Sequence, residues 1–200
     1  MNDTAEPTVV IVPGLRDHVP EHWQTLLAER LDKVRTVPPL ERDGLSRAAR
    51  VAALDAVLAD IEGPVVLVAH SAGVMITVHW AQKSSRPVAG ALLATPPDFE
   101  SPLPQGYPSL DELDTHGWNP IPWRRLSFRS IVAASTTDPL ASYRRVAGMA
   151  EAWGSHLVDL GDVGHLNPAS GHGYWPRAEE LLRELTDPVT ASAAGRETGR

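Results

Sequence analysis

The chain contains no cysteine among its 200 residues. Disulfides, cysteine-ligated zinc, iron–sulfur clusters and a cysteine nucleophile are therefore excluded. Positive charge is also scarce, because 18 Lys and Arg residues stand against 25 Asp and Glu residues and give a formal net charge of -7. A protein that binds a phosphate backbone needs a concentrated basic face, and no run of Lys or Arg supplies one. We therefore expect no nucleic-acid partner.

Long apolar runs are missing as well. No window approaches the roughly 20 apolar residues of a membrane-spanning helix, and the first residues, Met-Asn-Asp-Thr-Ala-Glu-Pro, are acidic rather than apolar like a secretory leader. The content of 42% hydrophobic and 22% charged residues is that of an ordinary globular protein. We predict a soluble, cytoplasmic protein with no membrane partner. One domain is expected over residues 1–187, followed by a flexible tail over 188–200.

Short runs rich in β-branched residues recur without the alternation of a half-exposed strand. Such runs fit strands that are buried on both faces of a parallel sheet. They alternate with segments of helical apolar spacing, which is typical of βαβ units and a doubly wound, mostly parallel sheet. The predicted strands are Thr8–Val12, Arg35–Val37, Val65–Ala69, Val88–Ala94, Ile131–Ala134 and His156–Leu160, and the predicted helices are Glu21–Val34, Ser46–Ile61 with Ser46 as N-cap, Val74–Gln82, Tyr143–Trp153 and Glu179–Leu185.

Proline is frequent, with 18 residues, and much of the excess lies between Ala94 and Trp123. We expect this stretch to be a long irregular insertion, and a loop of such length in a compact domain is usually functional or disordered. It also contains Tyr107 and Trp118. Two interpretations stay open: its aromatic side chains wall an acyl or aromatic pocket, or they fold a long surface loop onto the sheet.

The strongest functional signal is the strand–turn–helix around Ser71. This serine follows a predicted strand in the sequence A-H-S-A-G, a variant of the G-x-S-x-G nucleophile elbow, whose small neighbours allow a tight turn. Ligands of open parallel sheets bind at the carboxyl ends of the strands, where such a turn presents the hydroxyl beside the next helix. The alternative is a strand that happens to end in His-Ser before a glycine-bearing helix start.

A serine hydroxyl is a weak nucleophile at neutral pH, and it needs a base that is itself oriented by a carboxylate. The chain order expected on such a fold is serine, acid, histidine. Asp138 follows one predicted strand and His165 follows the last one, so both lie at the sheet edge of Ser71. Taken alone, the first would be a turn carboxylate and the second a loop histidine bonded to the backbone. Their order and common edge favour a Ser71–His165–Asp138 triad.

Other ionisable groups compete for these roles. Asp159 lies within the last predicted strand, and Asp162 is too close in sequence to His165 to reach behind its imidazole easily. His70 precedes the serine directly, but neighbours on an elbow point apart, so we expect it to line the site or pack beneath it. His172, in a glycine-rich loop, is the main rival for the role of base.

Acyl transfer also needs hydrogen-bond donors for a tetrahedral oxyanion. On such a fold they are the backbone N–H after the nucleophile, here Ala72, and one from the loop after an early strand, for which we choose Leu15. His18 and His22 are separated by a proline and a helix start, and no third ligand is evident, so we predict no metal and no cofactor. The candidates for the substrate pocket are His22, Trp23, His70, Trp118 and Trp123.

Five motifs resemble those of the α/β-hydrolase superfamily and, more narrowly, of the small retinoblastoma-binding-protein-9-like serine hydrolase family. They are V-P-G-L at 12–15, E-H-W-Q at 21–24, V-A-H-S-A-G at 68–73, S-T-T-D-P at 135–139 and G-H-L-N at 164–167. The resemblance implies a minimal α/β-hydrolase fold with about five to six parallel strands, helices on both faces and little or no cap domain. It also implies a Ser71–His165–Asp138 triad and esterase-type or related amide-cleaving activity.

Two features depart from the family pattern. Ala69 replaces the first glycine of the elbow, which is tolerable if the turn opens slightly. The animal member that names the family carries a cysteine-containing retinoblastoma-binding motif, so this cysteine-free chain is not expected to bind a retinoblastoma-type partner.

The sequence as a whole predicts an enzyme, a carboxylesterase-like serine hydrolase that is a monomer or homodimer and cleaves an ester or amide bond of a small acyl substrate. The alternatives are a non-catalytic binding module on a hydrolase scaffold, since a fold does not fix a function, and an acyltransferase that uses the same triad.

Overall fold

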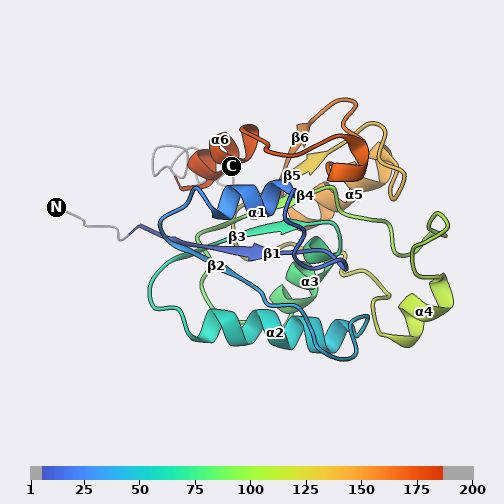
Figure 1. Ribbon diagram of the computed structural model, residues 1–200. Helices are drawn as coiled ribbons and strands as arrows, with labels where there is room; N and C mark the ends of the chain where they lie inside the picture. The colour runs from blue at the N-terminus through green and yellow to red at the C-terminus, as the bar shows by residue number, and fades with distance from the viewer. Residues whose placement is uncertain (1–5, 187–200) are drawn as a thin grey trace, which may run out of the picture.

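All neighbouring strands of the sheet are parallel, so the carboxyl ends of the six strands lie at one edge. The computed structural model describes residues 6–186, and the strand order is β2-β1-β3-β4-β5-β6 (Figure 1). The predicted tail over 188–200 lies outside the described residues. The strands are β1 (Thr8–Val12), β2 (Val34–Thr36), β3 (Val65–His70), β4 (Gly90–Ala94), β5 (Ser130–Ala134) and β6 (His156–Asp159). The helices are α1 (Trp23–Ala28), α2 (Arg47–Ala59), α3 (Ala72–Ala81), α4 (Leu110–Thr115), α5 (Tyr143–Trp153) and α6 (Arg177–Thr186), with a short 3₁₀ helix η1 (Pro168–Ser170).

The strands form where apolar, β-branched runs predict them. The run Thr8–Val12 is β1 without change, and β3 is buried along its whole length, as a central strand covered on both faces must be. Ser46 caps α2 by accepting a hydrogen bond from the backbone N–H of Ala49. The predicted doubly wound parallel sheet with helices on both faces is confirmed.

Two hydrophobic clusters cover the two faces of the sheet. Alternate residues of a strand point to opposite faces. Val10 and Val12 belong to the cluster that includes side chains of α2, α3 and α5, whereas Val9 and Ile11 belong to the cluster that includes side chains of α1 and α6. Figure 1 shows α1 and α6 above the sheet and α2 and α3 below it. Each such side chain, when fully buried, contributes about 1.5–3 kcal/mol to stability. Between residues 6 and 186, no helix is both long and apolar enough to cross a bilayer.

Two predictions differ from the structure by more than two residues, each for an identifiable reason: the end of the first helix and the irregular insertion. The helix predicted over Glu21–Val34 ends at Ala28, because β2 must begin at Val34 to pair with Val9 and the chain has to reverse before it. The irregular insertion contains α4, which begins with a capping box between Ser109 and Glu112. The spacing S-x-x-E is the sequence signal for such a helix start.

The order of the strands reverses between β1 and β3. From β1 the chain moves outward to β2, and it then returns to β3 on the other side of β1. Loops on either side of such a switch point diverge and leave a crevice at the carboxyl ends of the strands. The first turn of α3 rests directly on the end of β1, because a Cβ at Gly73 would lie 2.0 Å from the carbonyl oxygen of Val12.

Gly73→Ala is therefore expected to displace α3 from β1. Overpacking against a rigid backbone costs about 1–3 kcal/mol or more, so we expect the free energy of unfolding in urea to fall by at least about 2 kcal/mol. The matched control is Gly148→Ala within α5, where a Cβ would make ordinary contact with Trp123 at 3.8 Å. Alanine is the better helix former there, so the control should be neutral or slightly stabilising. Equal unfolding free energies for the two variants would contradict the packing described.

Candidate active site

Ser71 occupies a strained turn between β3 and α3. Its backbone has φ 56° and ψ -129°, a combination that residues other than glycine rarely adopt. Its N–H donates to the carbonyl oxygen of Ala94 at 3.0 Å, which ties the turn to the end of β4. Serine in the N-cap position usually accepts a hydrogen bond from the helix backbone, but here the hydroxyl makes no such bond. The strained turn thus leaves the oxygen available to another partner.

That partner is His165. Its Nε2 lies 2.9 Å from the Ser71 Oγ, and its Nδ1 lies 2.9 Å and 3.0 Å from the two carboxylate oxygens of Asp138. A carboxylate only accepts hydrogen bonds, so Nδ1 carries a proton and Nε2 presents its lone pair to the serine hydroxyl. The Asp138 side chain is 1% exposed, and one of its oxygens also accepts the N–H of Leu140. The structure therefore brings the three predicted residues into one hydrogen-bonded chain.

The loops after β5 and β6 hold this chain in place. Gly164 and Leu166, on either side of His165, both have positive φ angles, 55° and 49°. The hydroxyl of Thr137 accepts the N–H of Gly164 and donates to the carboxylate of Asp162. Asp162 thus supports the loop and does not orient the imidazole.

The other rivals from the sequence also have structural partners. Asp159 is exposed at the end of β6 and accepts the N–H of Gly161. His172 donates its backbone N–H to the carbonyl oxygen of Asn167 and does not line the cavity beside Ser71. Neither rival contacts the serine or the imidazole.

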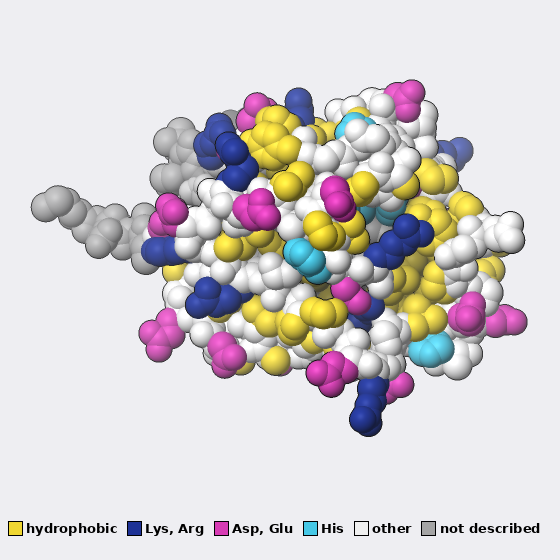
Figure 2. All heavy atoms as spheres, in the orientation of Figure 1, with side chains coloured by type: hydrophobic (Ala, Val, Ile, Leu, Met, Phe, Trp, Pro, Cys, Tyr) yellow, Lys and Arg dark blue, Asp and Glu magenta, His cyan; other side chains and the backbone are white. Residues whose placement is uncertain are grey.

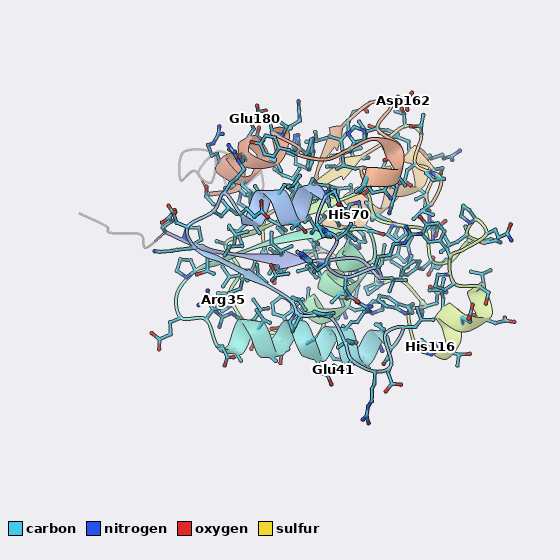
Figure 3. All side chains as sticks on the ribbon, viewed as in Figure 1. Arg35, Glu41, His70, His116, Asp162 and Glu180 are labelled. Carbon is cyan, nitrogen blue, oxygen red and sulfur yellow. The ribbon has the colours of Figure 1, made fainter. Side chains whose placement is uncertain are left out.

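Three histidine rings contact one another along the wall of the cavity. The His70 ring is 4.5 Å from the His22 ring and 4.9 Å from the His165 ring, measured between centroids, and Figure 3 shows His70 next to α1. The Nε2–H of His70 donates to the backbone carbonyl of His165 at 2.9 Å, so His70 supports the loop that carries the imidazole.

Both supporting rings are neutral at pH 7. Burial, followed by repulsion from His165 and His22, holds the pKa of His70 well below its usual value. Burial and the nearby His165 lower the pKa of His22 from 6.5 to about 4. The Nδ1 of His22 accepts the N–H of Gln24 as the cap of α1, which places the proton of this ring on Nε2.

A cavity of about 420 Å³ opens above Ser71 and His165, within the size range of small-molecule sites. Figure 2 shows this face hollowed, with hydrophobic side chains along its border. Leu15, Ala72, His22 and His70 are on its wall, as is Tyr107 from the insertion. The remaining wall is largely apolar and includes Val19, Leu45, Phe99, Pro108, Leu140, Pro168 and Ala169.

Two backbone N–H groups are placed beside the serine. Ala72 is the first residue of α3, and N–H groups in the first turn of a helix have no intrahelical acceptor. The chain at Gly14 approaches so closely that a Cβ there would lie 3.2 Å from the Ser71 Cβ. For Leu15, the next residue, no backbone carbonyl within residues 6–186 accepts the N–H.

Three of the predicted pocket aromatics do not line the cavity, and that prediction is wrong. Trp23 is fully buried beneath the site, edge-on to Trp175 and to His70. Trp118 is also fully buried, because its indole N–H donates to the carbonyl oxygen of Leu45 and its ring packs against a phenylalanine. Trp123 lies on the outer surface under the guanidinium of an α5 arginine. Trp23 and Trp118 thus stabilise the core and Trp123 packs on the surface, and none of the three faces the cavity.

Sequence reasoning assigned no role to Gln24, which belongs to the E-H-W-Q motif. Its amide donates to the carbonyl oxygens of Val12 at 3.2 Å and Val68 at 2.9 Å, and so joins β1 and β3 at the wall of the cavity. The available sequence signal is a polar glutamine at the start of a helix with apolar spacing, and the structure buries this side chain to 3% exposure. Within residues 6–186, no cluster of three or more His, Asp or Glu side chains is placed to hold a metal ion.

Comparison with known proteins gives a family. A serine hydrolase family model matches residues 9–184. A protein from Pectobacterium atrosepticum described as a YdeN-like hydrolase is 30% identical, with 90% of this chain and 91% of that chain covered and a TM-score of 0.76. The ydeN gene product from B. subtilis is 21% identical, with 90% and 98% covered and a TM-score of 0.73.

A third solved structure shares the fold alone. Est1E from Butyrivibrio proteoclasticus, solved with ferulic acid bound, is 11% identical, with 96% of this chain and 92% of that chain covered and a TM-score of 0.68. A search of curated proteins found no match.

The neutral rings of His22 and His70 predict that the fold is sensitive to acid. The unfolded chain binds a proton at His22 near pH 6.5, and the folded chain binds it only near pH 4. Protonation therefore favours the unfolded chain between these values, so the free energy of unfolding is full above pH 6.5 and falls as the pH drops toward 4. At about 1.4 kcal/mol per pKa unit, the loss from this ring is at most about 3.5 kcal/mol. His22→Asn keeps a capping side chain and removes the titration. Its free energy of unfolding, measured in urea from pH 7 to pH 4, should therefore fall less than that of the unaltered protein.

The exposed β6 residue His156 provides the control. His156→Asn should keep the pH dependence of the unaltered protein, and a His22→Asn profile parallel to both would contradict the assignment.

Proposed function

The chain belongs to the serine hydrolase family, and we propose that it is an esterase that uses Ser71 as its nucleophile. In this proposal His165 is the general base and acid, Asp138 orients its imidazole, and the N–H groups of Leu15 and Ala72 bind the oxyanion. The substrate is a small carboxylic ester. The narrower likeness to the retinoblastoma-binding-protein-9-like family stays a prediction, as do the cytoplasmic location and the monomeric or homodimeric state.

One observation carries the proposal: an unbroken hydrogen-bond chain runs from a buried carboxylate through an imidazole to a serine hydroxyl at the floor of a cavity. A nucleophile within hydrogen-bond reach of a base that is oriented by a third group is the arrangement that activates serine for acyl transfer. A module that only binds ligands does not need all three groups in contact, so the geometry favours an enzyme.

The reaction follows from the positions of these groups. Ser71 Oγ attacks the ester carbonyl carbon while His165 Nε2 takes the hydroxyl proton, and Asp138 stabilises the imidazolium that forms. The carbonyl oxygen becomes an oxyanion beside the two backbone N–H groups. Collapse breaks the bond to the alcohol oxygen, which receives the proton from Nε2. A water molecule then attacks the acyl-enzyme with the same base and releases the carboxylic acid.

The size and lining of the cavity suit a substrate with a small, largely apolar acyl or aryl group. Its wall is formed mainly by aliphatic and aromatic side chains, and about 420 Å³ accommodates a compact molecule instead of a long lipid chain. The similar fold of Est1E holds ferulic acid, an aromatic carboxylic acid of the kind that ester hydrolysis releases. This likeness supports an ester substrate without fixing its acyl group.

Labelling with a fluorophosphonate tests the proposed nucleophile. We expect one adduct on the peptide that contains Ser71, and no adduct after Ser71→Ala. His165→Ala and Asp138→Asn should slow labelling and lower kcat/KM for a 4-nitrophenyl ester by about 10³-fold or more, since removal of one triad member typically costs this much.

The rival histidine provides the control. His172→Ala should label and turn over like the unaltered protein. Labelling that survives His165→Ala but is lost in His172→Ala would move the base, and an unlabelled wild-type protein would favour the binding module.

A further inference from the structure

Among residues 6–186, the cavity wall includes two residues with an Arg, Lys, Asp or Glu side chain. They are Arg16 and Asp17, both in the loop that follows β1. Everything else that faces the cavity is apolar, uncharged polar or histidine, and the rings of His22 and His70 are held neutral by burial. The charge that a ligand meets outside the triad is therefore decided in this loop.

The carboxylate of Asp17 is already neutralised. It lies 2.8 Å and 3.5 Å from two nitrogens of Arg50, whose side chain is 6% exposed. Further donors of this guanidinium reach the carbonyl oxygens of Gly44 and Leu15. A buried guanidinium needs such a partner. Asp17 therefore serves as the ion-pair partner of Arg50 and is not free to bind a cationic ligand.

Arg16 has no such partner. It is exposed, and across residues 6–186 no carboxylate forms an ion pair with it. Its guanidinium carbon lies over the ring of Tyr107, 5.7 Å from the centroid. Contact with an aromatic face orients a guanidinium without neutralising it. Tyr107 belongs to the insertion and also lines the cavity, so the charge sits where the β1 loop and the insertion meet.

The position of Arg16 relative to the serine limits what it can contact. Gly14 touches Ser71, with 3.2 Å between its would-be Cβ and the Ser71 Cβ. Arg16 lies two positions further along the chain, which places its backbone within about 7 Å of that contact. Arg16 and Ser71 line the same cavity, so a small ligand in it can lie between the guanidinium and the serine hydroxyl. Guanidinium binds carboxylates with two parallel hydrogen bonds.

We propose that Arg16 binds a carboxylate of the substrate, so that this site takes esters that carry a second, ionised carboxyl group. This inference rests on the proposed function and adds the substrate class. The chain as a whole has a formal net charge of -7, which repels anions at long range. A preference for an anionic ester would therefore have to come from a local cation, and Arg16 is the residue on the wall that supplies one.

Matched ester pairs test the proposal. The acyl pair is 4-nitrophenyl hydrogen adipate and its neutral methyl ester; the alcohol pair is 4-acetoxybenzoate and the neutral 4-acetoxybenzamide. We would measure kcat and KM for the unaltered protein, Arg16→Gln and Arg16→Lys. Arg35→Gln is the charge-matched control, because Arg35 is on β2 and does not line the cavity (Figure 3).

In at least one pair we expect Arg16→Gln to lower the anionic-to-neutral ratio of kcat/KM about 10- to 100-fold, mainly through KM, as loss of a charge-assisted hydrogen bond does. Arg16→Lys should restore part of the ratio, and Arg35→Gln should leave it unchanged. Added salt should weaken the preference of the unaltered protein, because the guanidinium is exposed. An Arg16→Gln ratio equal to that of the unaltered protein in both pairs, or an equal drop in Arg35→Gln, would overturn the proposal.

A binding experiment separates this inference from the proposed function. Hydrogen adipate ester is titrated into Ser71→Ala protein, with and without Arg16→Gln, and followed by NMR. Weaker binding in the double variant supports the carboxylate site whether or not the ester is cleaved, and equal binding in both proteins contradicts it. Cleavage of the neutral esters that disappears in Ser71→Ala establishes the hydrolase independently of Arg16.

Discussion

The backbone turn at Ser71 is the constraint on which the site depends. At φ 56° and ψ -129° the chain passes from β3 into α3 within one residue, and the hydroxyl is left without a helix-capping role. Such strain persists only where the surroundings hold it. Here Gly73 lets α3 press against the end of β1, and the N–H of Ser71 is bonded to the end of β4. Buried strands on both sides thus supply the rigidity that the turn requires.

Parallel strand order brings the remaining groups to the same edge. Asp138 and His165 follow neighbouring strands, β5 and β6, and the loops that carry them are bonded to each other through Thr137. His70 adds a bond from the end of β3 to the backbone of His165. Because the buried rings of His70 and His22 are neutral, they support the site without placing a second positive charge beside the imidazolium that catalysis requires.

Features set by short sequence patterns could be predicted, whereas features set by three-dimensional contacts could not. The apolar run Thr8–Val12 and the A-H-S-A-G turn specify their own local structure, so β1 and the elbow follow from the sequence. Trp118 and Trp123 look alike in a proline-rich insertion. Only the fold shows that one indole finds an acceptor at the carbonyl of Leu45 and the other lies on the surface. Likewise, only the fold shows that Asp17 pairs with Arg50 of α2, which leaves the neighbouring Arg16 without an ion pair among the described residues.

The most direct test of the account is to trap the covalent intermediate. Purified protein is mixed with excess 4-nitrophenyl acetate, quenched in acid within the first turnovers, and analysed by intact and peptide mass spectrometry. If Ser71 is the nucleophile, one acetyl group per chain is expected on the peptide that contains Ser71, together with a burst of nitrophenol of matching size. Steady nitrophenol release without an adduct at the earliest times, or an acetyl group on another residue, would contradict it.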